Sequence, residues 1–95
     1  MSYTIQITPT AINDIAVGIE YYNAASPDLG YRFADGVAEF LERIAEWPTA
    51  SAIRYKNIRC KPMKQFPYLI TFIIDEATHS VNILRVFHTH QSPLY

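Results

Sequence analysis

The stretch Phe66-Pro67-Tyr68-Leu69-Ile70-Thr71-Phe72-Ile73-Ile74 is nearly continuous in apolar and β-forming residues, and it decides the fold class. Such a run is typical of the central strand of a sheet. Asp75 to Thr78 then turns the chain, and Val81 to His88 is predicted as the last strand. Before the central strand, Ile53 to Tyr55 and Ile58 to Pro62 predict two shorter strands. The second half of the chain is therefore expected to form a hairpin-linked sheet.

The first half of the chain has a different period. Tyr3 to Ile7 alternates apolar and polar residues, as in a strand with one buried face. Thr8-Pro9 and Ser26-Pro27-Asp28 each predict a helix start, because the hydroxyl caps exposed amides and proline suits the first helical position. Asn23 to Ala25 is expected to connect the two helices, and Pro48 to end the second. Apolar residues at helical spacing are Ile12, Ile15, Ala16, Ile19 and Tyr22 in the first helix, and Leu29, Phe33, Val37, Phe40, Leu41, Ile44 and Trp47 in the second.

These patterns predict an α+β fold. An N-terminal strand precedes an antiparallel helix hairpin, and a mainly antiparallel sheet of three or four further strands follows, with the helices on one face. Ninety-five residues fit one domain, 1–95. Apolar residues make up 49% of the chain, which excludes a disordered protein.

The same composition guides the expected location. No apolar run approaches the ~20 residues that span a bilayer, and the first residues do not resemble a signal peptide. Cys60 is the single cysteine, so no internal disulfide can form, and we expect it to be a buried, inert thiol. The predictions are a cytoplasmic protein without membrane contact, metal or cofactor.

Charge is distributed unevenly along the chain. The net charge is -1, but residues 1–50 carry -5 and residues 51–95 carry +4, together with all three histidines. Five basic residues and no acidic one fall in a short segment: Arg54, Lys56, Arg59, Lys61 and Lys64. A compact domain with this asymmetry is expected to present a basic surface suited to an acidic or phosphate-rich partner.

Several short motifs in this order resemble the RelE/ParE superfamily of bacterial toxins, the toxic halves of type II toxin–antitoxin operons. The motifs are Ile7-Thr8-Pro9 with Ala11 and Asp14-Ile15, then Ile19-Glu20-Tyr21-Tyr22, Ser26-Pro27, Phe66-Pro67-Tyr68-Leu69-Ile70 with Asp75, and Ile83-Leu84-Arg85-Val86-Phe87-His88-Thr89. The resemblance covers almost the whole chain and implies the fold described above. It also implies a cognate antitoxin whose acidic C-terminal segment wraps the toxin.

The resemblance implies two alternative activities. RelE-like members cut messenger RNA in the ribosome, whereas ParE-like members inhibit DNA gyrase without being nucleases. RNA cleavage needs a base, an acid and cations around one phosphate. Arg59 and Lys61, two apart in a strand, leave the same face and are similar to the lysine pair that RelE-like enzymes display on the open face of the sheet. The alternative is an edge strand whose charges discourage aggregation.

Other parts of a nuclease site are less complete. Tyr68 stands where RelE-like enzymes carry an arginine, and Gln91 where both branches often carry one. Arg85 is a potential substitute, but it alternates with Val81, Ile83 and Phe87, so it is expected to leave the face opposite to His88 unless the strand contains a bulge.

Histidines near the C-terminus remain candidates for acid–base chemistry. His88 and His90 share a face if the strand continues that far, and histidine titrates near neutral pH. Some nucleases of the superfamily use a histidine and a tyrosine near the C-terminus, and Tyr95 is available for such a role. The alternative for His88 is a structural hydrogen bond at the strand end. Two histidines without a nearby cysteine or carboxylate are a poor metal-ligand set.

The sequence therefore favours a toxin of the ParE-like branch that binds DNA gyrase and is silenced by its antitoxin. The candidate residues for binding the target or the antitoxin are Arg54, Lys56, Arg59, Lys61, Lys64, Arg85 and Tyr95. The alternatives are a ribosome-dependent messenger RNA endonuclease, with Arg59, Lys61, His88 and His90 as candidate catalytic residues, and an inactive antitoxin-binding module.

Overall fold

Two helices lie between the first strand and the rest of the sheet in chain order. The computed structural model describes residues 2–90 of the 95. The elements are β1 (Thr4–Ile7), α1 (Pro9–Ala25), α2 (Pro27–Glu46), a short 3-10 helix η1 (Pro48–Ala50), β2 (Ala52–Tyr55), β3 (Ile58–Pro62), β4 (Tyr68–Asp75) and β5 (Ser80–His88). Every predicted strand is present, whereas η1 was not predicted.

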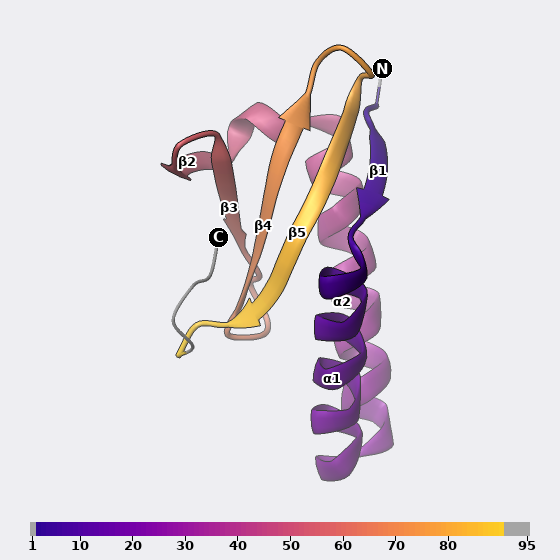
Figure 1. Cartoon of the computed structure of the whole chain (residues 1–95). Coiled ribbons are helices and arrows are strands. Elements are labelled where there is room, and N and C mark those ends of the chain that lie inside the picture. Colours follow the sequence, from indigo (N-terminus) through magenta and orange to yellow (C-terminus); the bar gives the residue numbers. More distant parts are fainter. Residues whose placement is uncertain (1, 91–95) are drawn as a thin grey trace.

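The strands form one sheet in the order β1-β5-β4-β3-β2. β1 pairs in parallel with β5, and the other neighbouring strands are antiparallel. In Figure 1, α2 lies behind the sheet, α1 lies in front of α2 and beside the edge of β5, and the two helices run side by side beyond the lower ends of the strands. The predicted α+β class and the helix hairpin on one face are confirmed.

The helix boundaries follow the capping residues. The Thr8 hydroxyl accepts a hydrogen bond from the N–H of Ala11 at 3.2 Å, as predicted for a capping residue. The predicted connection at Asn23 to Ala25 is wrong, because α1 continues through these residues, where alanine favours the helix. The break comes at Ser26, which is extended (φ -167°, ψ 134°) because it precedes Pro27. Within residues 2–90, neither helix has the length and apolar character needed to cross a membrane.

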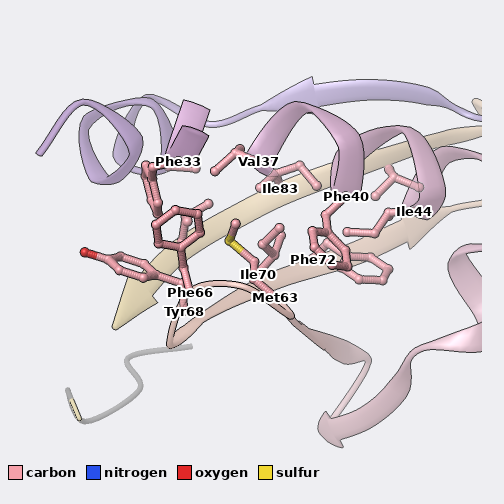
Figure 2. Close-up of a cluster of buried hydrophobic side chains, with 13 residues drawn as sticks. Phe33, Val37, Phe40, Ile44, Met63, Phe66, Tyr68, Ile70, Phe72 and Ile83 are labelled. Atoms are coloured by element: carbon pink, nitrogen blue, oxygen red, sulfur yellow. The ribbon is translucent and has the colours of Figure 1, made fainter. Parts of the chain in front are cut away.

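The core lies between α2 and the side of the sheet that faces the helices (Figure 2). The ring of Phe33 meets those of Phe66 and Tyr68 nearly edge to face, with centroids 5.3 and 4.8 Å apart. Each such aromatic pair adds about 0.5–1.5 kcal/mol beyond the burial of its area. The other buried side chains of this core include Val37, Phe40 and Ile44 from α2, and Ile70, Phe72, Val81, Ile83 and Val86 from the sheet. The apolar stripe predicted for the second helix therefore does form the core.

Three residues assigned to the apolar stripes are exposed instead: Ile12, Ala16 and Trp47. Trp47 is 67% exposed, because α2 ends at Glu46 and the backbone of Trp47 leaves helical geometry (φ -136°, ψ 68°). Ile12 is 56% exposed, because the buried side of α1 is centred on Ala11 and Gly18. Helical spacing alone did not locate the centre of the buried side of α1.

Gly18 allows α1 to approach α2 closely. A Cβ atom at Gly18 would lie 2.5 Å from Cε2 of Phe33, whose ring is fully buried. We predict that Gly18→Ala lowers the free energy of unfolding by about 1–3 kcal/mol, because the added methyl group overpacks the core. Chemical denaturation in urea measures the change.

Gly36→Ala is the matched control for this substitution. Its Cβ would come closest to the flexible end of Met63, at 3.3 Å, and would meet the ring of Phe66 at an ordinary contact distance of 3.9 Å. The gain in helix propensity of up to about 1 kcal/mol should therefore offset the crowding. Equal free energies of unfolding for the two variants would show that crowding between residue 18 and Phe33 does not destabilise the fold.

Candidate functional site

Five of the eight basic residues lie in residues 54–64, which we call the basic segment: Arg54, Lys56, Arg59, Lys61 and Lys64. None of them forms an ion pair with any residue that the structure describes. The three basic residues outside the segment are all paired: Arg32 with Asp28, Arg43 with Glu39, and Arg85 with Asp14. The uncompensated positive charge of the chain is therefore concentrated in the basic segment, and this region is best suited to an acidic partner.

Arg59 and Lys61 leave the same side of β3, as predicted, but that side faces the helices. Arg59 pairs with Phe72 and Lys61 with Ile70, and opposed residues on antiparallel strands point to the same face. Phe72 and Ile70 are fully buried in the core against α2 (Figure 2). The expectation that these two cations stand on the open face is wrong. Their spacing places them on one side, but the register between β3 and β4 decides which side it is.

Contacts at the end of α2 hold these two half-buried cations. The Nη1 atom of Arg59 donates to the carbonyl oxygens of Ser51 at 2.7 Å and Thr49 at 3.4 Å. The Nζ atom of Lys61 lies 5.8 Å from the ring centroid of Phe40, in cation–π geometry. Arg59 therefore fastens the turn that follows α2, which is a structural role.

The other residues of the basic segment are exposed. Arg54 belongs to β2, an edge strand whose four residues are all exposed. Lys56 is in the turn to β3 with a positive φ of 53°, and its Nζ atom lies 5.3 Å from the ring centroid of Tyr55. Exposed cations at a strand edge suit both interpretations, a docking surface and protection against edge-to-edge aggregation.

The open face of the sheet is apolar rather than basic at its centre. Ile58, Ile73 and Leu84 line a shallow groove of about 540 Å³ there, and Arg85 is a further lining residue. No pattern in the sequence predicted this groove, because it depends on three strands coming together.

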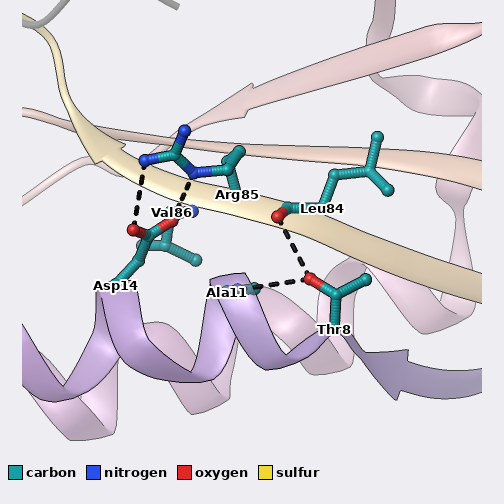
Figure 3. A network of polar contacts seen from close by, with 6 residues as sticks. All are labelled: Thr8, Ala11, Asp14, Leu84, Arg85 and Val86. Atoms are coloured by element: carbon teal, nitrogen blue, oxygen red, sulfur yellow. Dashed lines mark hydrogen bonds and ion pairs between the residues drawn. The ribbon is translucent and has the colours of Figure 1, made fainter. Parts of the chain in front are cut away.

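Arg85 is a paired cation that joins β5 to α1 (Figure 3). Its Nε atom donates to Oδ2 of Asp14 at 2.7 Å, and its Nη2 atom donates to Oδ1 at 3.2 Å. The N–H of Val86 also donates to Oδ2 of Asp14, at 3.0 Å. The hydrogen bonds that Arg85 donates to the Asp14 carboxylate raise the pKa of its guanidinium above the ordinary value. Asp14 thus ties the helix to the strand through both a side chain and the backbone.

A bulge in β5 changes which residues share a face. Thr71 pairs with Arg85 and Phe72 with Ile83, so Leu84 is an extra residue. The prediction that Ile83 lies on the same side as Arg85 is therefore wrong, because the bulge returns Ile83 to the core. The pairing from Arg85 to His88 is regular, and these two side chains leave opposite faces as predicted.

His88 and His90 form an aromatic cluster with Tyr68 at the end of β5. The ring of His88 lies 5.3 Å from that of Tyr68 and stacks on that of His90 at 4.9 Å. The N–H of His90 donates to Nδ1 of His88 at 3.1 Å, which is the structural hydrogen bond considered for this position. Burial raises the pKa of the Tyr68 hydroxyl, so this phenol stays protonated at neutral pH.

The fold does not bring the cationic pair and the histidines together. Arg59 is aligned with Phe72 and His88 with Tyr68, four residues apart on β4. At ~3.3 Å per residue and ~4.8 Å between strands, the backbones of Arg59 and His88 are about 16 Å apart. An acid or base and the cations of a nuclease must reach the same phosphate. This arrangement does not form one compact catalytic site.

Cys60, a metal site and two C-terminal residues are the other candidates from the sequence. Cys60 is buried as predicted, and burial raises the pKa of its thiol, which disfavours the reactive thiolate. Among residues 2–90, no three His, Cys, Asp or Glu side chains are grouped so that they could hold a metal ion. Gln91 and Tyr95 lie outside the described residues.

Comparisons with known proteins agree with this fold. The family described as "ParE toxin of type II toxin-antitoxin system, parDE" matches residues 5–93. A structure of the chromosomal ParDE toxin–antitoxin system from P. aeruginosa superposes with a TM-score of 0.79 at 14% identity, covering 92% of this chain and 96% of that one. The toxin–antitoxin complex RelBE2 from Mycobacterium tuberculosis gives a TM-score of 0.67 at 24% identity, covering 93% and 92%. No curated protein sequence matches significantly.

Removing the Asp14 carboxylate should destabilise the protein strongly. Its side chain is 13% exposed and that of Arg85 23% exposed. Asp14→Ala leaves the Arg85 charge and the Val86 N–H without their partner, so we predict a loss of about 2–3 kcal/mol in the free energy of unfolding. Asp28→Ala is the control, because it breaks a surface pair worth at most about 1 kcal/mol. Urea unfolding of both variants tests this, and similar losses would contradict the role of Asp14.

Proposed function

Because the chain belongs to the family of ParE toxins of type II toxin–antitoxin systems, we propose that it stops bacterial growth by binding DNA gyrase, without cutting RNA. A toxin of this kind needs a complementary surface for its target and no convergent acid–base groups. The basic segment and the exposed β2 edge provide such a surface. Arg54, Lys56 and Lys64 are the exposed cations that we assign to it.

The separation of the cations from the histidines carries this proposal. Arg59 donates to backbone carbonyls beside η1, whereas His88 is packed against Tyr68 at the other end of β4. RNA cleavage requires both sets of groups at a single phosphate. Binding a protein surface does not require their convergence, so the same residues are compatible with target binding.

The second part of the proposal is an antitoxin that docks on the basic segment. Both similar structures were determined as toxin–antitoxin systems or complexes. Five cations without ion pairs among the described residues give a surface whose charge is complementary to an acidic partner. The antitoxin segment that covers this surface is therefore acidic.

A gyrase assay and a ribosome assay separate the two activities. We expect the purified toxin to inhibit DNA supercoiling by gyrase at an equimolar ratio, while messenger RNA on translating ribosomes stays intact. Messenger RNA cutting that is abolished by Arg59→Ala or His88→Ala, but not by the control Arg32→Ala, would instead establish a ribosome-dependent nuclease.

Induction without the antitoxin provides a third measurement. Growth should stop when the folded toxin accumulates. Normal growth at high levels of folded protein would contradict both toxic activities and would identify an inactive antitoxin-binding module.

Charge reversal tests the antitoxin surface. The double variant Arg54→Glu and Lys56→Glu should bind the antitoxin more weakly, mainly through a slower association rate, because complementary charges steer the encounter. The loss should shrink at high salt, where the charges are screened. Arg32→Glu, an exposed cation outside the basic segment, is the control and should leave the rate nearly unchanged. Unchanged affinity of the double variant at low salt would exclude the basic segment as the docking surface.

A further inference from the structure

A hollow of about 220 Å³ lies where the end of α2 meets η1 and β3. Ile44 and Ala50 contribute apolar walls, and Trp47 lines it with an indole that is 67% exposed. Arg43 and Lys61 also line the hollow. The site thus combines a small apolar cavity, a large exposed aromatic side chain and two cations.

The two cations differ in how their charge is compensated. Arg43 lies 5.0 Å and Lys61 5.8 Å from the ring centroid of Phe40, so both stand over the same aromatic side chain. Arg43 is already paired with Glu39 at 2.6 Å. Lys61 has no carboxylate partner in the part of the chain that the structure describes. Lys61 is therefore the cation that remains available to a partner's carboxylate.

The size of the hollow suits one side chain. Sites that enclose a small-molecule ligand measure ~300–1,000 Å³, so this hollow is smaller than that class. Tryptophan and arginine are enriched among the residues that dominate protein–protein binding energy, and such residues surround pockets that an anchor side chain fills. An exposed tryptophan beside a small apolar hollow fits this pattern.

We propose that this hollow is an anchor site for the antitoxin's acidic segment, in which one apolar side chain packs against Trp47 and a neighbouring carboxylate pairs with Lys61. The inference rests on the antitoxin docking proposed above and adds the anchor contact. A short acidic peptide needs one carboxylate here. A nucleic acid would bring continuous negative charge past Glu42 and Glu46, which are exposed near the end of α2.

The surface continues from the hollow to the β2 edge. Arg59 bonds to Ser51, which lines the hollow. The strand partner of Arg59 is Ile53, which is 54% exposed on the same side of the sheet. Beyond Ile53 come Arg54 and Lys56. The acidic segment therefore passes from the end of α2 around the edge of β2, and it does not cross the open face of the sheet.

Fluorescence of Trp47 tests this site directly, because it is the only tryptophan of the chain. The probe is a synthetic twelve-residue peptide of serine and glycine that carries one central leucine and three glutamates, one of them next to the leucine. Two comparison peptides replace the leucine by serine or all carboxylates by amides, and a thymidine oligonucleotide of twelve residues represents nucleic acid. Acrylamide quenching and the emission maximum are recorded at low salt for the whole chain.

We expect the acidic leucine peptide to shift the Trp47 emission to the blue and to protect it from acrylamide. The serine peptide should bind about tenfold more weakly or worse, because the buried leucine is lost. Lys61→Gln should weaken the leucine peptide about fivefold, whereas the control Arg32→Gln should not. Absence of any change at millimolar peptide, equal effects of the leucine and serine peptides, or protection by the oligonucleotide alone would overturn the proposal.

The complex with the cognate antitoxin completes the test. Any tryptophan of the antitoxin is first replaced by phenylalanine, and Trp47 should then be protected from acrylamide in the complex. Protection by the peptide without protection by the antitoxin would overturn the assignment of the partner. A failed anchor with intact charge-reversal effects would leave the docking surface in place. Protection of Trp47 in a complex that charge reversal does not weaken would instead contradict docking on Arg54 and Lys56.

Discussion

The edge of β5 that β1 leaves uncovered is the constraint on which the structure depends. β1 pairs with β5 only from Ser80 to Ile83, and beyond this point the backbone groups of β5 need other partners. A buried backbone group without a partner costs about as much as a lost hydrogen bond, and an open edge also promotes aggregation. α1 meets both needs, because Thr8 donates to the carbonyl oxygen of Leu84 and Asp14 accepts from the N–H of Val86 (Figure 3). One helix therefore packs on the core and also replaces the missing part of a strand.

This contact and the β5 bulge together set which side chains reach the core. Leu84 is the extra residue, and it lies between Ile83 and the Asp14-bound pair of Arg85 and Val86. The bulge lets Ile83 and Val86 both enter the core, although their spacing of three would place them on opposite faces of a regular strand. The helix-facing side is thereby filled with apolar residues across β4 and β5. Because Arg59 and Lys61 share this side of the sheet, only the end of α2 leaves room for their charges.

Local signals predicted the elements well because their causes are local. Each helix boundary is set by residues that constrain the backbone at their own position: Thr8-Pro9, Ser26-Pro27 and Pro48. The side of the sheet on which Arg59 and Lys61 stand depends on pairing with Phe72 and Ile70, residues that lie far along the chain. The burial of the whole sheet decides this pairing, so it cannot be predicted from the residues around β3 alone. Trp47 shows the same limit, because its spacing matches the apolar stripe while the helix ends one residue earlier.

Membership in a toxin family leaves the chemistry open, because one fold can carry several activities and function depends on individual residues. In this chain the cations of the basic segment lie apart from the rings of Tyr68, His88 and His90. Two of these rings are also less available for acid–base chemistry, because Tyr68 is buried and Nδ1 of His88 already accepts a hydrogen bond. Of the cations that form no ion pair within residues 2–90, Arg59 and Lys61 lie near the end of α2 and Arg54 and Lys56 near the edge of β2, where Trp47 and Ile53 are also exposed. Exposed apolar side chains among uncompensated charges are typical of a surface that another protein covers. These features support the proposal that the chain recognises acidic protein surfaces and does not catalyse a reaction at a phosphate.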